Sequence, residues 1–170
     1  MRFVGIDPST KTGVAIIDAQ GNLIDGLEIT SKAKDPVRMI EIIDKVIEQL
    51  EPNDIITIEG FAYGAQGNAV SIQYGLGWAL RMRLHEHSGY TEIAPTALKK
   101  FASGKGNTKK DELSVHIYKA WGFEHKSDNV RDAYVLARMA LGLHQTTGQF
   151  SLGDYHKYQL EVLETVRKGK

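Results

Sequence analysis

The sequence contains no cysteine. This absence excludes disulfide bonds, thiolate zinc sites and cysteine nucleophiles, and it fits a reducing compartment. No apolar run approaches the roughly 20 residues that a membrane-spanning helix needs. The apolar run near the N-terminus is also too short for a signal peptide. From these absences we expect a cytoplasmic protein that does not contact a membrane.

An excess of charge is lacking as well, because 21 Lys and Arg residues balance 21 Asp and Glu residues. The overall balance therefore does not indicate nucleic-acid binding. The charges are nevertheless unevenly distributed. Residues 99–110 contain no acid but five lysines, which are Lys99, Lys100, Lys105, Lys109 and Lys110. Considered alone, this segment is a solvated basic loop; beside a carboxylate site, it would suit the phosphates of a nucleic-acid backbone.

Apolar patterns and turn residues predict an α/β protein with a mixed five-stranded sheet and helices on both faces. Short turns between the first three strands indicate an antiparallel meander, and the later strand–helix–strand order indicates parallel crossovers. We expect residues 1–145 to form one domain and residues 146–170 to form a helical tail. The expected strands are 2–7, 13–18, 23–30, 55–59 and 91–94, and the main helices begin near residues 36, 68, 95, 110, 128 and 155.

Two of the expected strands end in acids, Asp7 and Glu59. If these strands are parallel neighbours, both carboxylates emerge at the sheet edge where α/β proteins bind ligands. Asp128 and Asp132 lie four residues apart and therefore share one face of a helix start. Carboxylates brought together repel one another unless a cation lies between them, and Mg²⁺ prefers oxygen ligands. We therefore predict that the four acids are catalytic and bind metal.

Two further features suggest partners. Phe61 and Tyr63 closely follow Glu59, where aromatic rings would be able to stack on bases, although both could also belong to the core. In the predicted helix 68–87 and the residue before it, small residues recur at every fourth position. This stripe would allow either packing within the chain or a homodimer contact. Its members are Gly67, Ser71, Gly75 and Ala79.

Taken in order, these features resemble the Holliday junction resolvases of the RuvC type. The resemblance rests on Gly5-Ile6-Asp7-Pro8-Ser9 with Gly13, the strand ending at Glu59, the lysine-rich loop, and the helix that carries Asp128 and Asp132. It runs from about residue 1 to residue 143. Many of these resolvases space their last two acids three residues apart, which would place Asn129 in the fourth position. We predict Asp128 instead because it lies on the same helix face as Asp132.

The resemblance implies a ribonuclease H-like nuclease domain over residues 1–145. It further implies a homodimer that nicks four-way DNA junctions, with Mg²⁺ as cofactor and Mn²⁺ as substitute. In this comparison Asp7, Glu59 and Asp132 match the acids of the family, and Lys99 and Lys110 match positions that contact DNA.

Two alternatives start from other protein classes. A phosphotransferase of the actin and sugar-kinase type also begins with a strand, an acid and a Gly/Thr turn, but it needs two lobes where this chain has length for one. A non-catalytic module that binds junctions on the same fold is the second alternative. The retained acids argue against it, because carboxylates near phosphates weaken binding unless a metal is present.

Overall fold

The computed structural model describes residues 1–61, 69–145 and 155–169. Within this part of the chain the predicted order of strands and helices is confirmed, with boundaries that differ by a few residues at most. The elements are β1 (Phe3–Asp7), β2 (Thr12–Ile17), β3 (Leu23–Ile29), α1 (Val37–Glu48), β4 (Ile55–Glu59), α2 (Ala69–His87), β5 (Thr91–Ile93), α3 (Pro95–Ser103), α4 (Lys110–Trp121), α5 (Asp128–Gln145) and α6 (Lys157–Lys168).

The sheet is mixed, and its strand order is β3-β2-β1-β4-β5. β1 and β2 pair antiparallel, as do β2 and β3, because short turns connect them. β4 and β5 run parallel to β1, and each follows a helix that crosses over the sheet. β1 therefore lies at the centre, next to β4, and their carboxyl ends reach the same edge of the sheet.

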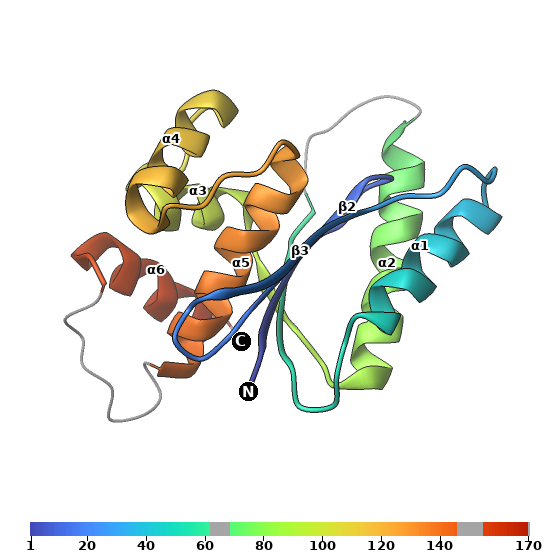
Figure 1. The fold of residues 1–170 in the computed structure, drawn as a ribbon, viewed down its shortest axis with the longest axis horizontal. Coiled ribbons are helices and arrows are strands. Elements are labelled where there is room, and N and C mark those ends of the chain that lie inside the picture. The colour runs from blue at the N-terminus through green and yellow to red at the C-terminus, as the bar shows by residue number, and fades with distance from the viewer. Residues whose placement is uncertain (62–68, 146–154, 170) are drawn as a thin grey trace.

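Helices cover both faces of this sheet (Figure 1). α1 and α2 pack on one face, and α3, α4, α5 and α6 lie on the other. Side chains alternate along a strand, so Val4 and Ile6 of β1 are buried toward α1 and α2, whereas Phe3 is buried toward α5. Asp7 has the same parity as Phe3 and thus emerges on the face that α5 covers.

α5 approaches β1 and β2 very closely because glycines face it. A Cβ atom at Gly5 would lie 1.9 Å from the main-chain oxygen of Ala133, and one at Gly13 would lie 2.0 Å from that of Asn129. No side chain fits in either place. The hydroxyl of Thr57 on β4 also donates to the main-chain oxygen of Leu136, at 2.8 Å. These contacts fix the start of α5 above the ends of β1 and β4.

The C-terminal helix α6 is part of the same packed unit. Its Val162 and Leu163 are buried in the core that also contains α3 and α5. Gln159 donates from Nε2 to the main-chain oxygen of Phe101, at 3.1 Å. α6 thus follows the predicted boundary at residue 145 in sequence, but it packs on helices that precede that boundary. Among the helices described, none is long and apolar enough to cross a membrane.

Candidate active site

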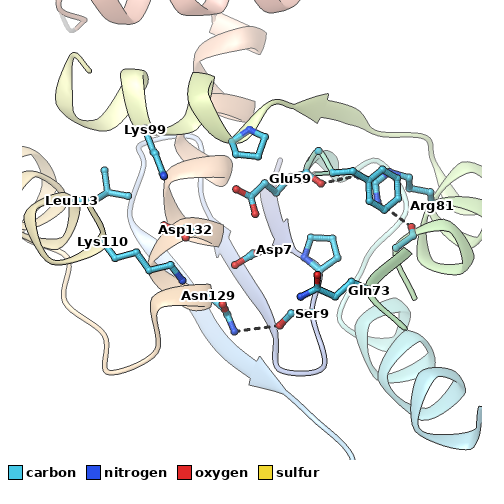
Figure 2. Close-up of a pocket in the computed structure, with 15 residues that line it drawn as sticks. Asp7, Ser9, Glu59, Gln73, Arg81, Lys99, Lys110, Leu113, Asn129 and Asp132 are labelled. Carbon is cyan, nitrogen blue, oxygen red and sulfur yellow. Dashed lines mark hydrogen bonds between the residues drawn. The ribbon is translucent and has the colours of Figure 1, made fainter. Parts of the chain in front are cut away.

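A cavity of about 260 Å³ opens at the carboxyl ends of β1 and β4. Asp7, Glu59 and Asp132 all line it, and Figure 2 shows their carboxyl groups facing a shared space. They come from β1, β4 and α5, which are far apart in the sequence. The fold therefore brings together three of the four predicted acids.

The sheet register places Asp7 beside Glu59. Ile6 pairs with Ile58 in the parallel ladder, and each acid follows directly. Both acids have the side-chain parity of the face that α5 covers, because Phe3, Thr57 and Ile55 on that face lie two or four residues before them. Asp132 projects from the first turns of α5 toward this pair. Strand alternation and the close approach of α5 thus bring the three carboxyl groups together.

Burial and the nearby Glu59 raise the pKa of two of these groups, Asp7 and Asp132. Burial raises the pKa of Asp7 well above its usual range, and the charge of Glu59 and a hydrogen bond with its side chain raise it further. Burial, followed by the charge of Glu59, raises the pKa of Asp132 to about 7, while Lys110 acts in the opposite direction. A hydrogen bond between two carboxyl groups requires a shared proton. A bound cation would neutralise the same repulsion.

Asp128 behaves differently from Asp132. It does not line this cavity, and its Oδ2 accepts a 2.8 Å hydrogen bond from Nζ of Lys110. That bond lowers the pKa of Asp128 below its usual value. The four-residue spacing does put both acids near the start of one helix, but only Asp132 reaches the space between Asp7 and Glu59. A fourth-ligand role for Asp128 therefore stays a prediction.

Asn129, rather than Asp128, lines the cavity beside Asp132. Its Nδ2 donates to the main-chain oxygen of Lys11 at 2.7 Å and to Oγ of Ser9 at 3.3 Å (Figure 2). Ser9 and Lys11 belong to the turn between β1 and β2. Asn129 thus ties this turn to the first turn of α5, at the position where many resolvases carry an acid.

Two of the five predicted lysines reach the cavity. Lys99 on α3 and Lys110 at the start of α4 line it, and both extend toward the carboxyl groups in Figure 2. Lys100 points elsewhere, because its Nζ lies 3.4 Å from Glu161 of α6. Lys105 and Lys109 are exposed in the loop and at its junction with α4, outside the cavity lining.

Of the two predicted aromatic residues, Phe61 lines the cavity wall. Its ring stacks on Tyr74 of α2, with centroids 4.8 Å apart, and the guanidinium of Arg81 lies 4.0 Å from its centre. These contacts hold the ring against α2. Tyr63 lies outside the described residues.

The small-residue stripe of α2 can also be placed in part. A Cβ at Gly75 would lie 3.6 Å from the methyl carbon of Met39 on α1, and Ala79 packs on the core beneath α1 and α2. Gly75 is nevertheless exposed, as is Ser71, so a homodimer contact through this stripe stays a prediction. Gly67 lies outside the described residues.

Sequence reasoning missed three polar residues that line the cavity, namely Ser9, Gln73 and Arg81. Ser9 belongs to the N-terminal motif Gly5-Ile6-Asp7-Pro8-Ser9, so the sequence already indicated that it lies near Asp7. Arg81 is flanked in α2 by the buried Leu80 and by the exposed Met82. That pattern does not reveal whether an arginine faces solvent or is buried, and only the packing of α2 against β4 decides it.

The donor set fits a hard divalent cation, because three carboxyl groups face one space and such cations prefer oxygen ligands. In the described part of the chain, however, no three His, Asp or Glu side chains already have the spacing of a formed metal cluster.

Comparisons with known proteins agree with this arrangement. No family model matches the chain. The crossover junction endodeoxyribonuclease RuvC of Helicobacter pylori strain 26695 is 26% identical over 148 residues, which cover 81% of this chain and 94% of that protein. The protein of the same name from strain G27 is 27% identical over 150 residues, with the same shares covered.

Solved structures match as well. A Thermus thermophilus RuvC structure matches 86% of this chain and 98% of that chain, with a TM-score of 0.68 and 18% identity. T. thermophilus RuvC in complex with a Holliday junction substrate has a TM-score of 0.67 and 19% identity, over 81% of this chain and 90% of that chain. At such identities the structural matches show the shared fold.

The chain thus has a ribonuclease H-like fold, with acids at the ends of β1 and β4 and a third acid on α5 facing the cavity. The sequence relatives point to one group of proteins with this fold. They are RuvC proteins by name, and at 26–27% identity they support the predicted resemblance to the RuvC-type resolvases.

Proposed function

We propose that this protein is a structure-specific DNA endonuclease that cuts four-way junctions by metal-dependent phosphodiester hydrolysis. The observation that carries the proposal is the cavity in which Asp7, Glu59 and Asp132 face one another beside Lys99 and Lys110. Acids alone would repel a DNA backbone, and lysines alone would bind it without cleaving it. The combination suits a phosphodiester held by cations next to a carboxylate centre.

We assign Asp7, Glu59 and Asp132 as ligands of Mg²⁺, with Mn²⁺ as substitute. The raised pKa values of Asp7 and Asp132 are the expected property of groups that exchange a proton for a cation. When bound, such an ion lowers the pKa of water and stabilises a leaving oxygen. Asp128 would reach the ion only after releasing Lys110, so we assign it first to positioning that lysine.

Lys99 and Lys110 would hold the scissile phosphate from the α3–α4 side of the cavity. Lys110 already stands near Asp7 and Asp132, whose charges raise its pKa after the larger effect of the Asp128 hydrogen bond. It therefore stays charged over the whole physiological range. Lys100, Lys105 and Lys109 extend the basic surface along the flanking backbone. Base stacking by Phe61 and Tyr63 remains a prediction.

A four-way junction has two-fold symmetry, and a homodimer with two equivalent cavities would match it. We therefore propose a homodimer bound to branched DNA. On α2, Trp78 and Met82 expose 56% and 60% of their surface, and they offer a better contact than the stripe of small residues. The absence of cysteine fits a cytoplasmic location, which we keep as a prediction.

The test is a cleavage assay on a synthetic four-way junction with Mg²⁺, Mn²⁺ or EDTA, comparing the wild type with Asp7→Asn. Asp44→Asn is the control, because Asp44 lies on α1 in an exposed ion pair with Arg83. We expect Asp7→Asn to bind the junction but to reduce cleavage to the level of the EDTA lane. Cleavage by Asp7→Asn in Mg²⁺ would refute the ligand assignment.

The comparisons do not favour the phosphotransferase alternative, because the sequence relatives are endonucleases by name. ATP binding measured by calorimetry would revive it. Junction binding by the wild type without cleavage in any divalent metal would instead support the non-catalytic module.

A further inference from the structure

Among the residues that the structure describes, Arg81 of α2 is the largest buried polar side chain, and only 2% of its surface is exposed. An arginine cannot lose its charge at any ordinary pH, so burial requires hydrogen-bond partners for its donors. Its position in the cavity wall was not predicted from the sequence. The contacts of Arg81 are therefore relevant to the candidate active site.

The guanidinium of Arg81 joins three elements. Nη2 donates to the main-chain oxygen of Glu59 at 2.7 Å, and Nη1 donates to that of Gly77 at 3.0 Å. Nε donates to Oε2 of Glu92 on β5 at 2.8 Å. Figure 2 shows the first of these bonds beside the carboxyl group of Glu59. Arg81 thus binds the backbone of a cavity acid directly.

The same guanidinium also holds the aromatic residue that follows the strand. It lies 4.0 Å from the ring centre of Phe61, a cation–π distance. Gly77 makes room for that ring, since a Cβ there would lie 2.5 Å from a ring carbon. The peptide NH of Gly60 donates to the main-chain oxygen of Ile93 at 2.7 Å. Glu59, Gly60 and Phe61 are therefore held from α2 on one side and from β5 on the other.

Glu59 still pairs with Ile93 in the ladder between β4 and β5, but it has lost its neighbour on the β1 side. Ile6 and Ile58 are the last pair between β1 and β4, so the ladder with β1 ends one residue before the acid. The ladder with β1 therefore gives the main-chain oxygen of Glu59 no hydrogen-bond partner. Arg81 supplies that partner and thereby limits rotation of the Glu59 backbone, which sets the direction of its carboxyl group.

We propose that Arg81 is a positioning residue for Glu59: it orients the carboxyl group through the Glu59 backbone and so preorganises the cavity for a divalent cation. The inference rests on the proposed function, in which Glu59 is a metal ligand. Groups that orient ligands in this way typically change metal affinity or activity by about 10- to 100-fold when removed.

The test compares Arg81→Met and Arg81→Lys with the control Arg83→Met. Arg83 lies on the same helix but is 47% exposed and pairs with Asp44, 3.1 Å away. Mn²⁺ affinity is measured by calorimetry, the Mg²⁺ concentration for half-maximal cleavage by titration, and folding by circular dichroism. We expect Arg81→Met to weaken Mn²⁺ binding by about 10- to 100-fold, with Arg81→Lys in between and Arg83→Met unchanged.

Junction binding in EDTA should be equal in all four proteins, because Arg81 points into the wall and not toward the lysines. Folded Arg81 variants with wild-type Mn²⁺ affinity and Mg²⁺ requirement would overturn the inference. Loss of folding in both variants would also overturn it in favour of a purely structural role. If instead the wild type shows no divalent-dependent cleavage, the proposed function fails, whatever the Arg81 variants do.

Discussion

Replacing Asp132 by Asn should make the metal-free protein more stable at alkaline pH. Burial and the charge of Glu59 raise the pKa of Asp132 from 3.8 to about 7. A carboxyl group with a raised folded-state pKa contributes stability that is present below pH 3.8 and is lost as the pH rises to about 7. At about 1.4 kcal/mol for each pH unit, the loss is at most about 4 kcal/mol.

Asp132 keeps partial solvent access, which screens its charge. We therefore expect Asp132→Asn to raise the free energy of unfolding at pH 8 by roughly 1–3 kcal/mol, and by clearly less at pH 5, where the wild-type carboxyl group is protonated in the folded state. The same substitution should abolish cleavage. Asp132, the proposed metal ligand, is thus predicted to destabilise the protein when no metal is bound.

The assay is urea unfolding in EDTA at both pH values, followed by the fluorescence of Trp78 and Trp121. Asp44→Asn serves as the control for removal of an exposed acid. Added Mg²⁺ should stabilise the wild type at pH 8 more than it stabilises the variant, because a ligand that binds only the folded state shifts the equilibrium toward it. A stability difference that is the same at both pH values, or a less stable variant at pH 8, would refute the reasoning.

Two further predictions concern the supporting structure and the substrate contacts. Gly5→Ala should lower the free energy of unfolding by about 1–3 kcal/mol and reduce cleavage, because its Cβ would displace α5 at Ala133. Urea unfolding and a cleavage assay measure the two effects. A variant that is as stable and as active as the wild type would contradict this prediction. Lys99→Ala and Lys110→Ala should each weaken junction binding and reduce the slope of log K against log salt by about 0.9 for each phosphate that the lysine no longer neutralises. Lys119→Ala, in the last turn of α4, is the control and should leave the salt dependence unchanged.

Much of the fold was predictable because its signals are local. The turns after Asp7 and around Gly21 predict a meander, and helical spacing from Val37 onward predicts α1. The strand that ends at Glu59 is found at the predicted residues. These features depend on neighbours within a few positions, so the sequence alone contains them.

The site was predictable in part. Two acids at strand ends indicated Asp7 and Glu59, since parallel strands bring their carboxyl ends to one edge. For the acids of α5, helical spacing made Asp128 and Asp132 equivalent. The structure distinguishes them, because Lys110 engages Asp128 while Asn129 turns into the cavity. That choice depends on where α4 and the β1–β2 turn lie, which spacing does not encode.

The order of the elements, the acids at the strand ends and the basic segment that follows β5 can thus be predicted from sequence, because each is a property of residues close together in the chain. Tertiary structure decided which acids meet, which lysines reach them, and that Arg81 is buried against the backbone of Glu59. The physical reason is that these outcomes depend on how closely α5 and α2 approach the sheet. Gly5 and Gly13 permit the approach of α5, Gly77 leaves room for the ring of Phe61, and only the assembled structure shows what fills these spaces.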